Sequence, residues 1–362
     1  MNAFPALATP AILVDRDRLD ANIADMQRHC SAHGVELRPH LKTHKMVEVA
    51  RRQLAAGAAG LTCAKLGEAE AMLPASPRSL FVAHSLADPG QAARVAALTE
   101  RVADFRVAVT SEAHAPALER VAAAAGRRLA VMLAVDTGLG REGVRDLAAA
   151  QRLAAMLARS RHLELRGFYT HEGNFYGIPP AQQRAKVIEL IARLAGVRDA
   201  IDRTLPIWPG CSVSAKLIAE NSAGRVQAVR PGAYMFGDLF LSEVTGVMPA
   251  SAVAVQVLAT VVDKPEPGLA LIDAGSKTFS SDRTGDNIHA KAVDGRDLAV
   301  VRVNEEHGYV RGTAVDSLRV GERVAFMPAH ICPVINLTDE VTVTAGDQIV
   351  ATWRVEARGK TR

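Results

Sequence analysis

A short basic segment near the N-terminus carries the side chains best suited to covalent chemistry. The segment Arg38–Lys45 has the sequence RPHLKTHK and follows an apolar run that is typical of a β-strand. If that strand belongs to a parallel barrel, its carboxyl end faces the active-site mouth. Positive neighbours favour the neutral amine of Lys42, and a neutral lysine amine can form a Schiff base with a carbonyl compound. The plainer alternative is a solvated basic loop between a strand and a helix.

A histidine and a cysteine near the C-terminus have the spacing of a metal-ligand pair. His330 and Cys332 lie two residues apart in PAHICPVINL. On an extended strand this spacing places both side chains on one face. Imidazole nitrogen and thiolate sulfur together favour Zn²⁺, with water and substrate completing the coordination shell. The alternative is a buried cysteine beside a hydrogen-bonded histidine.

Two glycine turns follow late strand-like segments. The first, PGCS, contains Gly210 and Ser212, and the second, RPGA, covers Arg230, Gly232 and Ala233. Glycine lets the backbone approach an anion closely, and the N–H groups at a helix start bind phosphate. Barrel enzymes commonly hold phosphate after strands seven and eight, which is where these turns fall in the strand count. Each turn taken alone is equally consistent with an ordinary strand-to-helix connection.

Three more polar side chains follow strand-like runs in the middle of the chain. Arg141, in DTGLGREGV, is suited to anchoring a cofactor oxygen or a carboxylate. Tyr169 and His171, in GFYTHEGNFYG, are suited to stacking on a ring and to moving protons. The alternatives are a surface arginine near a helix start and a polar barrel rim.

Short apolar runs alternate with helical periodicity between residue 35 and about residue 240. The strand-like runs number about eight, which is the tally of a (β/α)₈ TIM-type barrel. A doubly wound sheet is the rival, although no G-x-G-x-x-G motif opens the first unit. The runs cover residues 35–42, 60–65, 79–85, 105–109, 129–138, 163–173, 206–213 and 226–236.

The pattern changes after about residue 250, where β-branched runs are separated by Gly, Pro and Asp. This predicts a C-terminal antiparallel β domain, with which the strand AILVD at 11–15 is expected to pair. We therefore expect a barrel domain over residues 16–245 and a β-strand domain formed by residues 1–15 and 246–362.

Composition excludes several classes of protein. Among 362 residues, 49% are hydrophobic and the formal net charge is only +4, so the chain is not disordered as a whole. Basic residues are dispersed and aromatic residues make up 4%, which disfavours a nucleic-acid partner. Four cysteines without a C-x-x-C pair indicate thiols in a reducing compartment. Because neither a secretory signal nor a membrane-length apolar run is evident, we expect a cytoplasmic protein without a membrane partner.

Several motifs in order along the chain resemble one enzyme family. They are TPAILVDRDRLDANI, RPHLKTHK, TCAKLGEAE, DTGLGREGV, RPGAYMFGD, DAGSKTFSSDR, EEHG and PAHICPVINL. Together they resemble the D-serine dehydratase / D-threonine aldolase family, which comprises pyridoxal 5'-phosphate (PLP) enzymes of the alanine-racemase-like fold type III. The resemblance implies a barrel with a β domain, a homodimer, and a divalent metal beside the cofactor.

The resemblance also implies roles for individual residues. Lys42 matches the lysine that binds PLP covalently, and His330 and Cys332 match the metal pair. The remaining matches are cofactor contacts: Arg141 near the phenolic oxygen, Tyr169 beside the ring, Arg230 at the place of the racemase arginine that faces the pyridine nitrogen, and Gly210, Ser212, Gly232 and Ala233 around the phosphate.

The resemblance further implies a lyase acting on D-3-hydroxyamino acids, and the metal pair bears on which one. The aldolase branch typically carries His-x-Asp, which suits Mn²⁺, whereas His-x-Cys suits Zn²⁺ and the dehydratase branch. We therefore expect dehydration of D-serine or D-threonine to a 2-oxo acid and ammonia, with Lys42 removing the α-proton. The alternatives are D-threonine aldolase, with His171 as base, an amino-acid racemase, and a non-catalytic PLP-binding protein.

Overall fold

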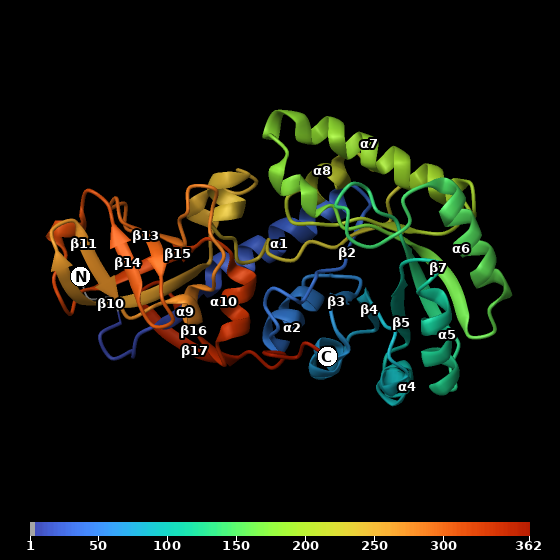
Figure 1. Ribbon diagram of the computed structural model, residues 1–362, viewed down its shortest axis with the longest axis horizontal. Coiled ribbons are helices and arrows are strands. Elements are labelled where there is room, and N and C mark those ends of the chain that lie inside the picture. Colours follow the sequence, from blue (N-terminus) through green and yellow to red (C-terminus); the bar gives the residue numbers. More distant parts are fainter. Residues whose placement is uncertain (1–3) are drawn as a thin grey trace. The chain divides into compact units, whose positions relative to one another are not determined.

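The computed structural model describes residues 4–362, and its contacts divide them into two compact units (Figure 1). The strand unit gathers the described residues through Ile23, then Thr43–Met46 and Ala233–Gly359. The barrel unit gathers Ala24–Lys42, Val47–Gly232 and Lys360–Arg362. Across residues 4–362, no helix has the length and apolar character needed to cross a bilayer.

Eight parallel strands form the inner wall of the barrel unit. Six make one sheet in sequence order and two more pair with each other. A parallel bridge from His40 to Thr62 and a backbone hydrogen bond of 3.3 Å from Gln227 to Ile207 join the two sheets into a ring. The predicted (β/α)₈ barrel is confirmed, and the doubly wound alternative is wrong. The strands are β2 (Glu36–Leu37), β3 (Leu61–Cys63), β4 (Ser79–Ser85), β5 (Asp104–Val109), β6 (Leu129–Ala134), β7 (Leu163–Tyr169), β8 (Ile207–Trp208) and β9 (Ala228–Val229).

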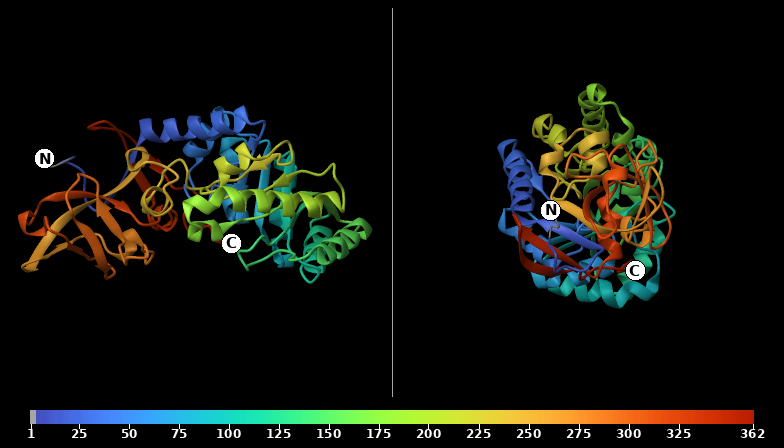
Figure 2. Two further views of the ribbon diagram at one scale, coloured as in Figure 1. Left: turned by 90° about the horizontal axis from the view of Figure 1, so that it is seen from above. Right: turned by 90° about the vertical axis from the view of Figure 1, so that its left-hand side faces the viewer.

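Amphipathic helices follow these strands and cover the outside of the sheet, as α4 to α7 show in Figures 1 and 2. In α6, for example, the buried residues Ala150, Leu153, Ala154 and Leu157 recur at helical spacing, and the Asp146 carboxylate caps the first turn by accepting from the Ala149 N–H at 2.8 Å. The helices are α1 (Arg16–Ala32), α2 (Val47–Ala55), α3 (Leu66–Ala71), α4 (Ala92–Arg101), α5 (Ala115–Ala124), α6 (Leu147–Arg159), α7 (Pro180–Asp199) and α8 (Ala215–Glu220).

The strand unit is built on a closed ring of six antiparallel strands. Strand β10 pairs with β15 through its first half and with β11 through its second half, and bulges near Asp263 accompany the change of course. Strand β1 extends the sheet, antiparallel to β10 and parallel to β16, so the expected pairing of residues 11–15 is confirmed. The elements are β1 (Ala11–Asp15), β10 (Val255–Glu266), β11 (Leu269–Ile272), α9 (Ser276–Phe279), β12 (Ala290–Ala292), β13 (Ala299–Val303), β14 (Gly308–Arg311), β15 (Arg323–Pro328), α10 (Ile331–Leu337), β16 (Glu340–Ala345) and β17 (Gln348–Arg354).

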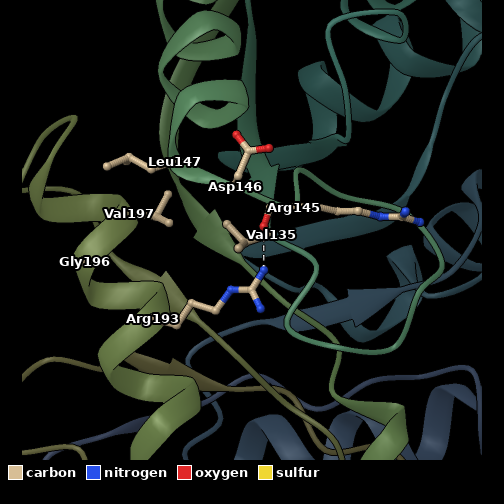
Figure 3. A pocket seen from close by; sticks show the side chains of 7 residues that line it. All are labelled: Val135, Arg145, Asp146, Leu147, Arg193, Gly196 and Val197. Carbon is tan, nitrogen blue, oxygen red and sulfur yellow. Dashed lines mark hydrogen bonds between the residues drawn. The ribbon is translucent and has the colours of Figure 1, made fainter.

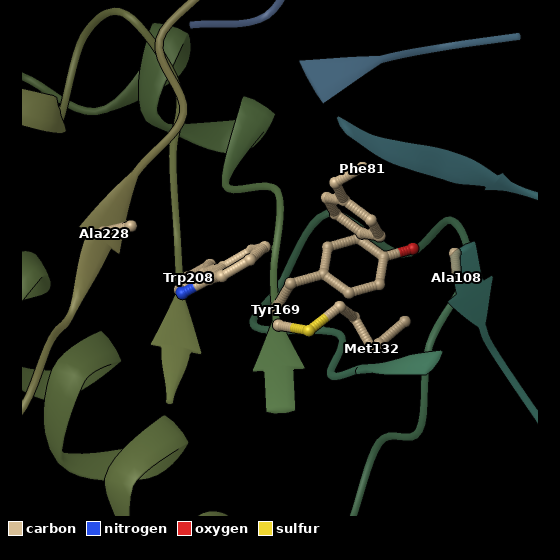
Figure 4. Packing of buried hydrophobic residues seen from close by; sticks show 7 residues of the cluster. Phe81, Ala108, Met132, Tyr169, Trp208 and Ala228 are labelled. Atoms are coloured by element: carbon tan, nitrogen blue, oxygen red, sulfur yellow. The ribbon is translucent and has the colours of Figure 1, made fainter. Parts of the chain in front are cut away.

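Aromatic side chains fill the barrel interior (Figure 4). The Phe81 and Tyr169 rings meet edge to face with centroids 5.0 Å apart. Two guanidinium groups lie over the buried Trp208 ring, with the Arg38 Cζ at 4.1 Å and the Arg106 Cζ at 4.5 Å from its centroid. Each of these pairs adds an electrostatic attraction to the burial of the indole.

We predict that Trp208→Ala destabilises the protein by about 3–5 kcal/mol, because it leaves a cavity and removes the aromatic partner of the buried Arg38 and the half-buried Arg106. Urea unfolding followed by circular dichroism measures the change. A loss below about 1 kcal/mol contradicts a central packing role for this ring.

Candidate active site

The backbone of Lys42 is fixed by a turn at the carboxyl end of β2. The Leu41 N–H donates to the Thr62 carbonyl at 2.7 Å, and the Lys42 N–H donates to His40 Nδ1 at 3.3 Å. The His40 N–H in turn donates to the Pro231 carbonyl at 2.9 Å. These bonds to neighbouring strand ends hold the half-buried Lys42 at the barrel mouth, where we expected it.

His171 follows β7, and its environment defines its protonation state. Burial, with the nearby charge of Lys42 as the next cause, lowers the pKa of His171 to about 3. The ring is therefore neutral near pH 7. Its Nδ1–H donates to the Gly210 carbonyl at 3.2 Å, which leaves the lone pair on Nε2. His171 can accept a proton or a hydrogen bond through Nε2.

This shift gives a prediction for the pH dependence of stability. The folded pKa of about 3 lies below the ordinary value of 6.5. Between these values the unfolded chain binds more protons, so stability falls as pH is lowered. We expect His171→Asn to remove on the order of 2 kcal/mol of the wild-type loss between pH 6.5 and pH 4.5. Denaturant titrations at both pH values test this, with the exposed His33→Asn as control. Identical pH profiles for wild type and His171→Asn contradict the assignment.

Tyr169 ends β7 with its hydroxyl buried and unpaired. The residue is 4% exposed, and its hydroxyl oxygen has no hydrogen-bond partner among the residues that the structure describes. Burial, together with the Glu142 carboxylate, raises the pKa of Tyr169, so the hydroxyl stays protonated. An orphaned donor in a buried place is costly unless a ligand satisfies it. The barrel mouth therefore fits a ligand with a polar atom beside this ring.

Arg141 is an exposed, loosely paired cation at the mouth. It lines the same cavity as Tyr169 and His171, and its side chain is 56% exposed. Its closest carboxylate is that of Glu142, with nitrogen and oxygen 3.9 Å apart, and Glu142 itself accepts from the Ser85 hydroxyl at 2.8 Å. Because Arg141 is only loosely paired, it is suited to binding an anionic or phenolic oxygen.

The two glycine turns lie against each other at the ends of β8 and β9. The Gly232 N–H donates to Ser212 Oγ at 3.1 Å. A Cβ on Gly210 would lie 2.2 Å from the Arg230 backbone nitrogen, so only glycine fits there. The Gly210 N–H donates to the Glu172 carboxylate at 3.1 Å. The close approach that requires glycine is thus between two protein backbones.

Arg230 is buried, and its guanidinium group donates hydrogen bonds to the backbone at two strand ends. Its Nε donates to the Trp208 carbonyl at 3.0 Å, and a terminal nitrogen donates to the Thr170 carbonyl. Burial lowers the pKa of Arg230 to about 10, so it remains charged near neutral pH. Two of its donors therefore tie the ends of β7 and β8 together. Its expected place opposite a pyridine nitrogen stays a prediction.

His330 and Cys332 differ from the prediction in local structure. We expected an extended strand, but β15 ends at Pro328, His330 precedes the first residue of α10, and Cys332 lies in the first turn. The strand assignment is wrong because the apolar run ICPVINL suits either element, and Pro333 is tolerated in a helical first turn. The two side chains are nevertheless neighbours. Burial lowers the pKa of His330, but the hydrogen bond and charge of Cys332 outweigh this effect, together with Asp282, and raise it to about 9.

Three further side chains support the pair, and none was found from the sequence. Asp282 accepts from His330 Nδ1 at 2.6 Å, which leaves Nε2 for a metal. Asp238 accepts from the Ile331 N–H at 3.0 Å and so anchors the start of α10. The Thr43 hydroxyl lies 3.1 Å from Cys332 Sγ. Thr43 directly follows Lys42 in the sequence.

Within residues 4–362, no group of three or more His, Cys, Asp and Glu side chains is arranged to hold a metal ion. The His330–Cys332 pair stays a predicted metal site with two protein ligands, and an imidazole with a thiolate is a donor set that suits Zn²⁺.

A separate cavity of about 290 Å³ lies between α6 and α7 (Figure 3). Its lining is largely aliphatic, and Arg193 on its wall donates to the Arg145 carbonyl at 2.6 Å. None of the predicted site residues lines it. Among the cavities along the described chain, the one at Arg141, Tyr169 and His171 is the candidate for catalysis.

The fold and these residues define a class: a (β/α)₈ barrel with a lysine at its mouth, joined to an antiparallel strand unit that carries a His–Cys pair. Comparisons with known proteins agree. Residues 14–239 match the family described as "Alanine racemase, N-terminal domain", and residues 254–344 match "Putative serine dehydratase domain". The chain belongs to this alanine-racemase-like family of enzymes with a serine dehydratase-type second domain.

Individual relatives cover nearly the whole chain. A D-threonine aldolase from Arthrobacter sp. is 30% identical over 98% of this chain and 93% of its own length. A D-threo-3-hydroxyaspartate dehydratase from Delftia sp. (strain HT23) is 33% identical over 96% of this chain and 97% of its own length. A solved metal-free structure of a cysteine-to-alanine variant of D-threo-3-hydroxyaspartate dehydratase superposes with a TM-score of 0.85 at 29% identity, covering 98% of this chain and 99% of that chain. The expected family is confirmed, and its members are PLP-dependent lyases of D-hydroxyamino acids.

Proposed function

We propose that this protein is a PLP- and metal-dependent lyase of D-3-hydroxyamino acids, and that dehydration to a 2-oxo acid and ammonia is its reaction. The observation that carries the proposal is the contact of Thr43 with Cys332 directly after Lys42. Thr43 contacts the thiol suited to a metal and is the next residue after the lysine suited to a carbonyl cofactor. The dehydratase relative, at 33% identity, supports the choice of reaction.

The residues at the barrel mouth fit PLP. Lys42 supplies the amine, and the buried Tyr169 hydroxyl supplies a donor that lacks a partner among the described residues. Arg141 supplies a loosely held cation for an oxygen of the ring. We assign the phosphate to the joined turns of Gly210, Ser212, Gly232 and Ala233, with Arg230 bracing the strand ends beneath them. When bound, PLP supplies an electron sink for negative charge at the substrate α-carbon.

The catalytic proton transfers fall to Lys42 and His171. Lys42 would hold the cofactor through its amine and would take the α-proton of the substrate. His171 is neutral and holds a lone pair on Nε2, so it accepts a hydrogen bond from a substrate hydroxyl. Its Nδ1–H bond to Gly210 fixes this tautomer.

The metal ligands we propose are His330 and Cys332, with Zn²⁺ as the metal. Asp282 holds the imidazole with Nε2 directed away from the carboxylate, as carboxylates do for metal-bound histidines. When bound, the metal supplies Lewis acidity to the β-oxygen of the substrate, which makes a poor leaving group easier to expel.

Aldol cleavage is the second candidate, and a specific observation favours it. The unprotonated His171 Nε2 suits a base that removes the β-hydroxyl proton, after which Cα–Cβ cleavage releases glycine and an aldehyde. The Arthrobacter relative with this activity is 30% identical.

Product analysis separates the two candidates. The purified protein is incubated with D-threonine and with D-threo-3-hydroxyaspartate, with and without a chelator. We expect a 2-oxo acid and ammonia, and loss of turnover after chelation. Stoichiometric glycine and aldehyde overturn dehydration in favour of aldol cleavage. The L-enantiomer as the main product, or no turnover of any D-3-hydroxyamino acid, overturns the proposed class of reaction.

We further propose a cytoplasmic homodimer. All four cysteines lie in the described part of the chain and none is disulfide-bonded, which suits a reducing compartment.

A further inference from the structure

A buried carboxylate next to His171 has no role in the reaction described above. Glu172 is 0% exposed, although a carboxylate is costly to bury without strong hydrogen bonds. Its two oxygens have different partners. Oε2 accepts from the Gly210 N–H at 3.1 Å, and Oε1 accepts from the Ser214 hydroxyl at 2.6 Å.

The two partners of Glu172 flank Ser212 on the turn after β8. Gly210 lies two residues before Ser212, and Ser214 lies two residues after it and precedes the first residue of α8. One carboxylate therefore fixes both ends of a five-residue turn with Ser212 at its centre. At that centre, Ser212 Oγ accepts from the Gly232 N–H at 3.1 Å and so connects the turn after β8 to the turn after β9.

His171, the residue before Glu172, also forms a hydrogen bond with Gly210. His171 donates to the Gly210 carbonyl at 3.2 Å, so two consecutive residues bind the N–H and the C=O of one glycine. The Arg230 guanidinium donates to the carbonyl of Thr170, the residue before His171. Burial raises the pKa of Glu172, and the bonds from Ser214 and Gly210 and the charge of Arg230 oppose this shift. Hydrogen bonds with the loop at 170–172 therefore fix the conformation of the turn at 210–214.

We propose that Glu172 is a positioning residue for phosphate: it sets the shape of the Gly210–Ser214 turn so that Ser212 and Gly232 can bind the phosphate of the cofactor. This inference rests on the proposed function, because it takes the two turns as the phosphate site. Glu172 itself does not touch the phosphate in this account. A residue that only stabilised the barrel would affect phosphorylated and unphosphorylated ligands alike.

The test compares PLP with pyridoxal, which lacks the phosphate, by fluorescence titration of the cofactor-free full chain. In Glu172→Gln, the amide can still accept from Ser214, but its NH₂ group opposes the Gly210 N–H. We expect PLP affinity to fall by at least about tenfold while pyridoxal affinity changes by less than about threefold. Ser214→Ala, which removes one of the two bonds, is expected to act in the same direction with a smaller effect.

Glu119→Gln is the matched control. Its carboxylate also holds a serine hydroxyl and a backbone N–H, those of Ser160 and His162, which lie just before β7 at its amino end. It is expected to leave the ratio of PLP to pyridoxal affinity unchanged. Equal losses for both ligands in Glu172→Gln and in Ser214→Ala, or no loss in either variant, overturn the inference while the proposed function stands. If the wild-type chain does not prefer PLP to pyridoxal, both are overturned.

Discussion

Lys42→Ala is expected to abolish the visible absorbance of the lysine-bound cofactor and to reduce turnover of D-3-hydroxyamino acids by about 10²–10⁴-fold or more. The variant lacks both the amine that holds the cofactor and the base that takes the α-proton. His171 offers a base through Nε2 but no primary amine, so it cannot hold the cofactor covalently in place of Lys42. Absorbance spectra and initial rates of the purified variant measure both effects.

The control for this variant is Lys216→Ala. Lys216 lies in α8, and its ammonium is paired with Asp25 at 2.6 Å. Its removal is expected to leave the spectrum and the rates near those of the wild type. A Lys42→Ala protein with the wild-type spectrum would show that a different amine holds the cofactor.

Removal of the thiol is expected to have the second largest effect. Cys332→Ala leaves His330 as the one protein ligand of the proposed pair, and a single imidazole does not retain Zn²⁺ through purification. We expect the bound metal to be lost and dehydration to fall by about 100-fold or more, with the cofactor spectrum retained. Elemental analysis and product assays on the same sample measure these changes.

Asp282→Asn is expected to weaken metal binding less than Cys332→Ala does. Because Asp282 orients His330 without binding the metal, metal affinity is expected to fall by about 10–100-fold. The buried Cys30 of α1 provides the control, since Cys30→Ala removes a thiol far along the chain from the pair. Full metal content and full activity in Cys332→Ala would exclude the thiol from the site.

The barrel could be predicted because its strands are apolar runs separated by helical periodicity. The residues at which the strands end could not be predicted. The run at 163–173 was expected to be extended throughout, but β7 ends at Tyr169, and Thr170, His171 and Glu172 turn to bind the next loops. The run at 206–213 shortens to Ile207–Trp208 for the same reason, since its later residues bind other loops. Hydrogen bonds between loops leave no periodic signal in a sequence.

The candidate site could likewise be predicted only in part. Lys42, Arg141, Tyr169 and His171 could be proposed from the sequence because polar residues at the ends of strand-like runs are conspicuous. Asp282 was missed because it lies 48 residues before His330, and its role appears only when the chain folds. Glu172 was missed because an acidic residue before a glycine resembles a solvated loop, whereas the structure buries it completely.

Reduction of the holoenzyme with borohydride, followed by peptide mass spectrometry, identifies the lysine that binds the cofactor. Reduction makes the bond between cofactor and lysine permanent, so the labelled residue can be identified. We expect a single pyridoxyl group on Lys42. A label on Lys45 or on another lysine, or a purified protein that carries no label after incubation with PLP, would contradict it.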